Sequence, residues 1–208
     1  MSRFVVLGWG SLIWDLERLA PDVEGPWQMR AGPRLPMEFT RVSPKRKMGL
    51  VVCLDPRHGV ACATHAIVSR RHLVGEVVAD LAARERAPEE RIGRVCLASG
   101  ASHGATPDVI AAVAAWCRAT GRTGAVWTDL PSNFAETLGA PFSIARAEGY
   151  LRGLAGESLD EAVSYIENAP ADTDTPLRRH LAGSAWWRAE VARVAAVPAS
   201  RADDRATG

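Results

Sequence analysis

The sequence predicts an α+β fold, in which strands and helices occupy separate parts of the chain. Short apolar runs divided by turn residues fill positions 4–68, whereas a helical period dominates from position 132 onward. Segregation of this kind is typical of α+β proteins and differs from the alternation of a doubly wound parallel sheet. The short spacing of the runs indicates a largely antiparallel meander.

The first third of the chain contains most of the expected strands. An apolar run at 4–7 predicts a buried strand, which leads directly into two glycines. A short helix is expected at 12–19, before Pro21, and an irregular stretch rich in glycine and proline at 25–36. Three more strands are predicted between clear turns, at 37–42, 49–54 and 60–68.

The helical signals begin after position 68. Apolar residues at 73, 74, 77, 78 and 81 have a helical period and predict a helix over 69–84, with Ser69 as its N-cap. Thr106 and Pro107 suit a cap and a first helical position, so a helix is expected from there to Gly121. The remaining predicted elements are strands at 91–98 and 124–128 and helices at 159–168 and 176–194.

Composition excludes several classes of function. The chain has 208 residues, 47% of them hydrophobic and 24% charged, and a formal net charge of +1, so no nucleic-acid partner is expected. Its four cysteines form no CxxC pair, which is typical of buried thiols in a reducing compartment. We find no signal peptide and no apolar stretch of roughly 20 residues, and therefore expect a cytoplasmic protein without a membrane partner.

Gly8, Gly10 and Ser11 follow the first predicted strand and form the first candidate site. They do not match the dinucleotide fingerprint, because its third glycine would stand at position 13, where the chain has Ile. Glycines let the backbone approach a ligand closely, and successive N–H groups before a helix can bind an anion or a polarised carbonyl oxygen. A plain tight turn, with Ser11 as a helix N-cap, explains the same spacing.

Glu85 is the second candidate, because it continues the apolar stripe of the preceding helix. Leu73, Val77 and Leu81 are four residues apart on one face, and Glu85 is the next position on that face. Partial desolvation at the inner end of an apolar face favours a protonated carboxyl, as a general acid/base near neutral pH requires. Alternatively, the helix ends before Arg84 and leaves Glu85 in an exposed charged turn.

Two segments resemble the gamma-glutamylcyclotransferase-like family, and its ChaC-type, glutathione-degrading branch in particular. Leu7-Gly8-Trp9-Gly10-Ser11-Leu12-Ile13-Trp14 is similar to the family's N-terminal signature, in which a strand leads into Gly-Tyr-Gly-Ser-Leu-Ile-Trp, with Trp9 in place of the tyrosine. Leu81-Ala82-Ala83-Arg84-Glu85, followed by an expected strand, is similar to the segment that carries the family's catalytic Glu. The family's aromatic residue a few positions later is absent, and Ile92 lies near its place.

The resemblance covers roughly residues 3–98 and implies a small, mostly antiparallel β-barrel or meander with flanking helices. We expect this core within 1–130 and a helical C-terminal extension packed on it at 131–195. The segment 196–208 has no apolar pattern and is expected to be a disordered tail.

The resemblance also implies a reaction that needs no metal and no organic cofactor: a gamma-glutamyl group is cyclised to 5-oxoproline and its amine is released. It makes Glu85 the general acid/base. The residues implied to bind the small gamma-glutamyl substrate are Gly8, Trp9, Gly10, Ser11 and Leu12. Glutathione is one candidate substrate, and a compound of secondary metabolism with another leaving group is a second. The alternative function is a non-catalytic binding or regulatory protein on the same fold.

Arg41 is a further candidate for substrate binding. It alternates with Met37 and Phe39 on a predicted strand, so we expect it to face the cavity and, with the basic turn 45–47, to receive a substrate carboxylate. An exposed hairpin charge is the alternative. The strand end at 127–131, which carries Thr and Asp, is another candidate for lining a site.

The remaining polar residues give no competing site. Histidines and cysteines show no metal-ligand spacing, and Cys62 and His65 would lie on opposite faces of the strand expected at 60–68. The oligomeric state stays open, a homodimer included. An enzyme is favoured by a buried Glu85 that faces the Gly8 loop, and a binding protein by an exposed Glu85 paired with Arg84 or Arg86.

Overall fold

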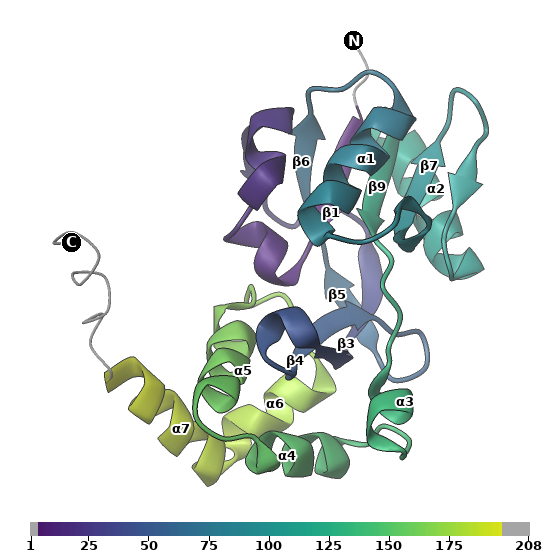
Figure 1. The fold of residues 1–208 in the computed structure, drawn as a ribbon. Helices are drawn as coiled ribbons and strands as arrows, with labels where there is room; N and C mark the ends of the chain where they lie inside the picture. The colour runs from purple at the N-terminus through teal and green to yellow at the C-terminus, as the bar shows by residue number, and fades with distance from the viewer. Residues whose placement is uncertain (1–3, 197–208) are drawn as a thin grey trace, which may run out of the picture.

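The computed structural model describes residues 4–196, which form two sheets and seven α-helices (Figure 1). The larger sheet has six strands in the order β2-β6-β1-β9-β7-β8, and the smaller has three in the order β4-β3-β5. In Figure 1 the larger sheet lies in the upper half of the molecule and the smaller sheet in the lower half.

The larger sheet is mixed because one of its strand pairs is parallel. β1 (Phe4–Gly8) lies between β6 (His65–Ser69), which is antiparallel to it, and β9 (Gly124–Thr128), which is parallel to it. Parallel strands end at the same edge of a sheet, so the segments after β1 and β9 come together. The outer strands are β2 (Val23–Gln28), β7 (Ile92–Cys96) and β8 (Ser102–His103).

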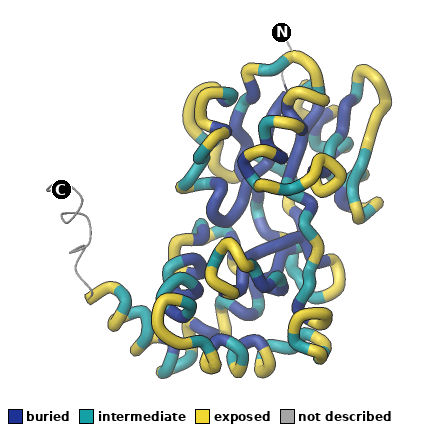
Figure 2. Tube along the Cα trace, viewed as in Figure 1, coloured by how far each residue is buried: buried dark blue, intermediate teal, exposed yellow. Residues whose placement is uncertain are grey.

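Two helices cover opposite faces of the larger sheet. In β1, Val6 belongs to the apolar cluster of α1 (Val74–Glu85), whereas Val5 belongs to the cluster of α2 (Pro107–Thr120). Because successive strand residues point to opposite faces, α1 and α2 lie on opposite sides of β1. Burial on both faces explains why β1 is apolar along its length and appears as a dark core in Figure 2.

The smaller sheet carries the C-terminal helices. β3 (Arg34–Ser43) pairs antiparallel with β4 (Gly49–Leu54) and β5 (Val60–Ala63). Every residue of β4 is buried, and the fifth helix packs on β4 while the sixth packs on β3. The five helices are α3 (Phe134–Leu138), α4 (Ile144–Gly153), α5 (Glu157–Asn168), α6 (Pro176–Gly183) and α7 (Ala185–Ala196).

The expected α+β class is confirmed, but within residues 4–196 the strands do not close into a barrel. The strand predicted at 60–68 breaks at Thr64, so β5 pairs with β3 in the smaller sheet and β6 pairs with β1 in the larger. Thr64 Oγ1 donates to Pro33 O at 2.6 Å, and Thr64 O accepts from Gly32 N at 3.0 Å. These bonds hold the chain at the crossing between two open sheets.

The helix predicted over 69–84 begins later than its N-cap signal indicates. Ser69 ends β6, and α1 begins at Val74 with Leu73 as its N-cap. Leu73 is 65% exposed, so the buried stripe of α1 starts at Val77 rather than at Leu73. The helix nevertheless continues through Glu85, one residue beyond the predicted end.

Three other expected elements differ from the structure. The helix expected at 12–19 is replaced by two 3-10 turns, Gly10–Ile13 and Glu17–Asp22, and residues 25–28 belong to β2 rather than to an irregular stretch. The helix expected at 176–194 is divided into α6 and α7 by Ser184. Ser184 Oγ donates a hydrogen bond to Glu148 Oε1 of α4 at 2.9 Å. The residues near Ser184 in the sequence do not predict this contact, because Glu148 is far away along the chain.

Two expectations reach beyond the described residues or remain open. The expected tail at 196–208 lies outside them except for Ala196, which ends α7. The limit of the core at 130 stays a prediction. Across residues 4–196, no helix is both long enough and apolar enough to cross a membrane.

Candidate active site

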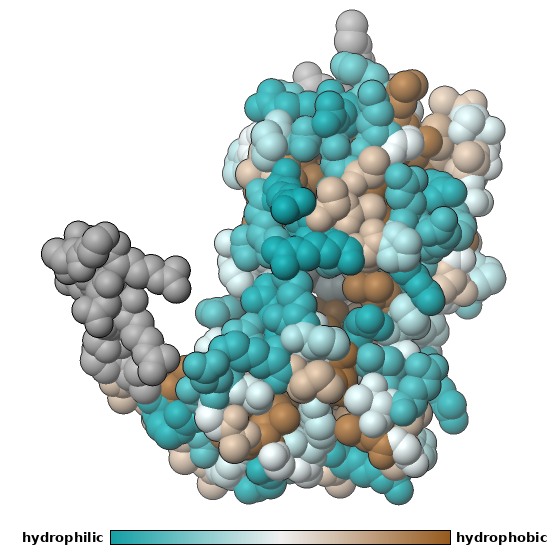
Figure 3. Space-filling view, viewed as in Figure 1, coloured by the Kyte–Doolittle hydropathy of each residue, from teal (hydrophilic) through white to brown (hydrophobic). Residues whose placement is uncertain are grey.

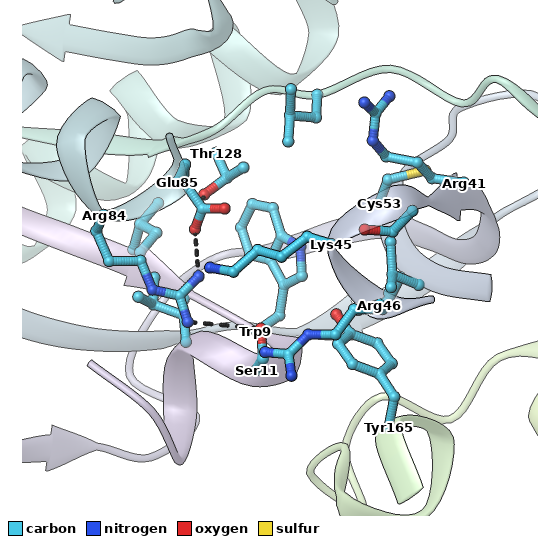
Figure 4. Close-up of a pocket in the computed structure, with 17 residues that line it drawn as sticks. Trp9, Ser11, Arg41, Lys45, Arg46, Cys53, Arg84, Glu85, Thr128 and Tyr165 are labelled. Atoms are coloured by element: carbon cyan, nitrogen blue, oxygen red, sulfur yellow. Dashed lines mark hydrogen bonds and ion pairs between the residues drawn. The ribbon is translucent and has the colours of Figure 1, made fainter. Parts of the chain in front are cut away.

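A cavity of about 80 Å³ lies where the two sheets meet, and Figure 4 shows its lining. One water needs about 10–15 Å³ of such space, so the cavity suits a small organic group rather than a nucleotide. In Figure 3 hydrophilic side chains gather on the surface over this junction. Six of the seven expected site residues line the cavity: Gly8, Trp9, Ser11, Leu12, Arg41 and Glu85.

The glycine loop (residues 8–11) leaves β1 and turns at once into a 3-10 turn. Gly10 has a φ of +56°, and a Cβ at this position would lie 2.6 Å from the Tyr165 hydroxyl oxygen. A Cβ on Gly8 would lie 2.4 Å from the ring of Trp27. Both glycines therefore allow the loop backbone to pack closely against large side chains.

Glu85 ends α1, and its side chain, which is 13% exposed, lines the cavity. Glu85 Oε1 accepts hydrogen bonds from Arg84 Nη1 at 2.7 Å and from Thr128 Oγ1 at 3.2 Å. Thr128 is the last residue of β9, and the parallel pairing of β9 with β1 places it at the same sheet edge as the glycine loop. Three separate candidates in the sequence thus meet at one point (Figure 4).

The guanidinium of Arg84 connects Glu85 to the glycine loop. Its side chain is only 2% exposed, and Nη2 donates to Asp15 O at 2.6 Å and lies 3.5 Å from Ser11 Oγ. Ser11 lies inside the 3-10 turn, whose N-cap is Trp9, so Ser11 is not the helix cap of the plain-turn interpretation. Glu85 faces the loop, as expected of an enzyme, and it is paired with Arg84 as in a binding protein, but it is not exposed.

Arg41 reaches the cavity from the opposite side, on a strand whose register with β4 shifts between Glu38 and Arg41. Nη1 donates to Pro131 O at 2.6 Å, burial lowers the pKa of Arg41, and among residues 4–196 it forms no salt bridge. Lys45 and Arg46 also line the cavity and pair with carboxylates outside it, Glu17 and Glu161 respectively, at 2.9 and 3.0 Å. The lining therefore carries four cations and one carboxylate, which favours an anionic ligand group.

Lys47, the third residue of the basic turn, does not contribute to the cavity. Its ammonium group pairs with Glu157 at 2.5 Å, and both side chains are at least half exposed. Asp129, in the strand end that was a further candidate, is buried and accepts a hydrogen bond from Ala105 N without lining the cavity. Of that segment, Thr128 and Leu130 reach the cavity wall.

Tyr165 is the site residue that sequence reasoning missed. It comes from α5, and its ring packs edge-on against Phe39 and Trp14, with centroid distances of 6.4 and 5.6 Å. Burial raises the pKa of Tyr165 to about 12. In the sequence it is one of several apolar positions on an amphipathic helix, so its pattern indicates core packing and carries no signal of a site.

Thiol and imidazole chemistry find no support in the geometry. Cys53 lines the cavity, but burial raises its pKa to about 12, so the thiol stays protonated at neutral pH and is a poor nucleophile. Cys62 lies in β5 and His65 in β6, so they belong to different sheets rather than to opposite faces of one strand. His65 Nδ1 accepts from Arg30 N at 2.9 Å, away from the cavity.

Comparisons of the chain with protein-family models, curated proteins and solved structures found no match. The functional conclusion therefore depends on the geometry of the cavity.

Proposed function

We propose that this protein is a gamma-glutamylcyclotransferase-like enzyme that cyclises the gamma-glutamyl group of a small peptide or amine to 5-oxoproline and releases the amine. The observation that carries the proposal is the meeting of Glu85 with the glycine loop in one cavity. The two segments that resemble the family lie far apart in the sequence, and a chance resemblance would not require them to form one site.

The reaction is an intramolecular acyl transfer. The alpha-amine of the gamma-glutamyl group attacks the gamma-carbonyl carbon, so that a new C–N bond closes a five-membered ring and the carbonyl oxygen becomes an oxyanion. The oxyanion then reforms the carbonyl as the original amide C–N bond breaks. The attacking nitrogen loses one proton and the leaving nitrogen gains one, so a single acid/base group can serve both steps.

The surroundings of Glu85 support its proposed role in this proton transfer. Its Oε1 is held by Arg84 and Thr128, which orients the carboxylate toward the cavity and leaves Oε2 without a hydrogen bond among the described residues. Nucleophile and electrophile belong to one substrate, so the main task of the protein is to hold the folded-back conformation. The cations on the opposite wall, Arg41 above all, can bind a substrate carboxylate.

A non-catalytic binding protein is the second candidate, and one observation favours it. The ion pair between Arg84 and Glu85, 2.7 Å long and largely buried, gives each charged side chain a partner inside the protein. A carboxylate whose only task is to neutralise Arg84 would form the same pair. The two candidates differ in whether replacing Glu85 removes turnover.

The test is release of 5-oxoproline from glutathione, gamma-glutamyl dipeptides and gamma-glutamyl amines, by the wild type and by Glu85→Gln. We expect wild-type turnover of at least one compound and a loss of about 10²-fold or more in kcat for the variant, as removal of a general acid/base causes. Glu89→Gln changes an exposed carboxylate in the segment between α1 and β7. It is the matched control and should keep wild-type activity. No release from any compound would favour the binding protein, and equal release by both proteins would eliminate Glu85 as the acid/base.

A further inference from the structure

The hydroxyl group of Tyr165 lies on the backbone of the glycine loop. A Cβ at Gly10 would be 2.6 Å from this oxygen, so the hydroxyl lies close against the loop. The same side chain lines the cavity that Glu85 faces. A residue of the C-terminal helices therefore lines the site, on the side of Arg46 in Figure 4.

The position of the ring is fixed on several sides. Phe39 of β3 and Trp14 pack edge-on against it, and the Arg46 guanidinium lies over its face at 5.5 Å from the centroid. Tyr165 itself is 6% exposed. A ring held in this way presents its hydroxyl at a defined place, which is what a preorganised hydrogen-bond donor requires.

The Tyr165 hydroxyl adds a side-chain donor beside the backbone of the glycine loop. A phenol hydroxyl can accept hydrogen bonds and donate its own proton at the same time. Because the Tyr165 side chain lines the cavity, its O–H can donate to a ligand bound there.

Burial also keeps this hydroxyl in the donating form. The pKa of Tyr165 is raised to about 12 because desolvation disfavours the phenolate, and the nearby carboxylate of Glu85 acts in the same direction. At neutral pH Tyr165 is therefore a neutral donor and not a base. The two groups have different tasks, since a carboxylate can take a proton whereas the phenol can only stabilise negative charge.

We propose that Tyr165 is a further catalytic residue, whose hydroxyl donates a hydrogen bond to the oxygen that becomes anionic when the gamma-carbonyl is attacked. This proposal rests on the proposed function. The hydrogen bond strengthens as charge develops on that oxygen, so it lowers the barrier without changing substrate binding to the same extent. It also gives α5 a role in the reaction, in addition to covering β4.

The test uses Tyr165→Phe, which keeps the packed ring and removes the hydroxyl. The chain has two tyrosines, and Tyr150→Phe is the matched control, because the Tyr150 hydroxyl donates to Met48 O at 2.6 Å and does not line the cavity. We expect kcat of Tyr165→Phe to fall about 10²–10³-fold, the usual loss of an oxyanion donor, with KM within about threefold. Tyr150→Phe should keep the wild-type kcat.

A second measurement follows the hydroxyl directly. With the tyrosine ring carbons that bear the hydroxyl labelled with ¹³C, the wild type gives two resonances, and Tyr150→Phe assigns them. Titration with 5-oxoproline and with slowly converted gamma-glutamyl compounds should shift the resonance of Tyr165 and leave that of Tyr150 in place. This titration uses the wild-type protein, so it tests the proposal even if Tyr165→Phe does not fold.

The outcomes separate this proposal from the proposed function. If the wild type releases 5-oxoproline and Tyr165→Phe keeps kcat within about threefold, Tyr165 is not catalytic and the proposed function stands. A drop in thermal stability without a change in kcat would likewise show a merely structural role. If the wild type releases no 5-oxoproline, the proposed function and the catalytic role of Tyr165 fail together, and an unmoved Tyr165 resonance would also exclude contact with these compounds.

Discussion

Arg84 is a full charge inside the protein, and its position decides how Glu85 can act. Removing two ions from water is costly, and a buried pair recovers that cost only when the remaining donors find acceptors. Arg84 meets this condition through Asp15 O, Glu85 and a longer contact to Ser11, although its Nε has no partner among the described residues. The pair is therefore better explained by the orientation that it gives to Glu85 than by stability.

Arg84→Met should destabilise the protein by about 3–5 kcal/mol, because it leaves the Glu85 carboxylate buried without its cation. The kcat should also fall, because Glu85 loses the group that orients its carboxylate. Urea unfolding and steady-state kinetics measure the two effects, and Arg84→Lys should recover part of both.

Arg86→Met is the matched control for this prediction. Arg86 is 64% exposed and lies 3.5 Å from Glu17, so its removal should change the free energy of unfolding by less than about 1 kcal/mol. A wild-type kcat in Arg84→Met would show that Arg84 does not act through Glu85.

The attachment of α6 to β3 depends on a buried carboxylate between the two elements. Glu38 is fully buried, and its Oε1 accepts from Phe39 N at 2.7 Å while Oε2 accepts from Leu177 N at 3.1 Å. Leu177 is the second residue of α6, so the carboxylate satisfies an N–H group at the start of that helix. Desolvation raises the pKa of Glu38, and the hydrogen bonds oppose this only in part.

The raised pKa predicts how this connection depends on pH. The folded protein binds the Glu38 proton more tightly than the unfolded chain, in which the pKa of Glu38 has its ordinary value of 4.5. The protonated carboxyl therefore contributes fully to the stability of the fold below pH 4.5, and this contribution is lost as pH rises through the folded pKa. The free energy of unfolding of the wild type, minus that of Glu38→Gln, should therefore decrease from pH 4.5 upward. Glu136→Gln, on an exposed residue of α3, should show no such trend. A difference that grows with pH would contradict the assignment.

The molecule as a whole places its cavity between two sheets, and each sheet supplies a different kind of group. The larger sheet and α1 bring the glycine loop, Glu85, Arg84 and Thr128 to one edge, whereas β3 and the turn after it supply the other three cations. The C-terminal helices close the far side through Tyr165. Neither sheet therefore contains a complete site by itself.

This arrangement predicts that residues 1–130 do not fold cooperatively on their own. Without α5 and α6, the fragment would expose β4, all of whose residues are buried in the full chain, and would leave Glu38 without Leu177. Far-UV circular dichroism in increasing urea should show one cooperative transition for residues 1–196 and none for 1–130. A cooperative transition of the shorter fragment would instead support an independent core.

Local signals in the sequence were sufficient for several elements and for part of the site. The strands near 4–7, 49–54 and 124–128 and the helix α2 are confirmed, because an apolar run or a cap with its proline depends only on neighbouring residues. The placement of Glu85, the glycine loop and Arg41 at one cavity agrees with the expectation from motif and alternation.

Contacts between distant residues account for everything that the sequence left unpredicted. The break at Thr64 depends on Gly32 and Pro33, the ion pair of Arg84 is completed by Asp15, and Tyr165 reaches Ser11 from a helix near the other end of the chain. No periodicity encodes such contacts, because their free energy comes from burial and hydrogen bonds that exist only once the two sheets have come together. Motif and alternation thus named Glu85 and the glycine loop as candidates, whereas folding brought them to a shared cavity and added Tyr165 and the contacts of Arg84 around them.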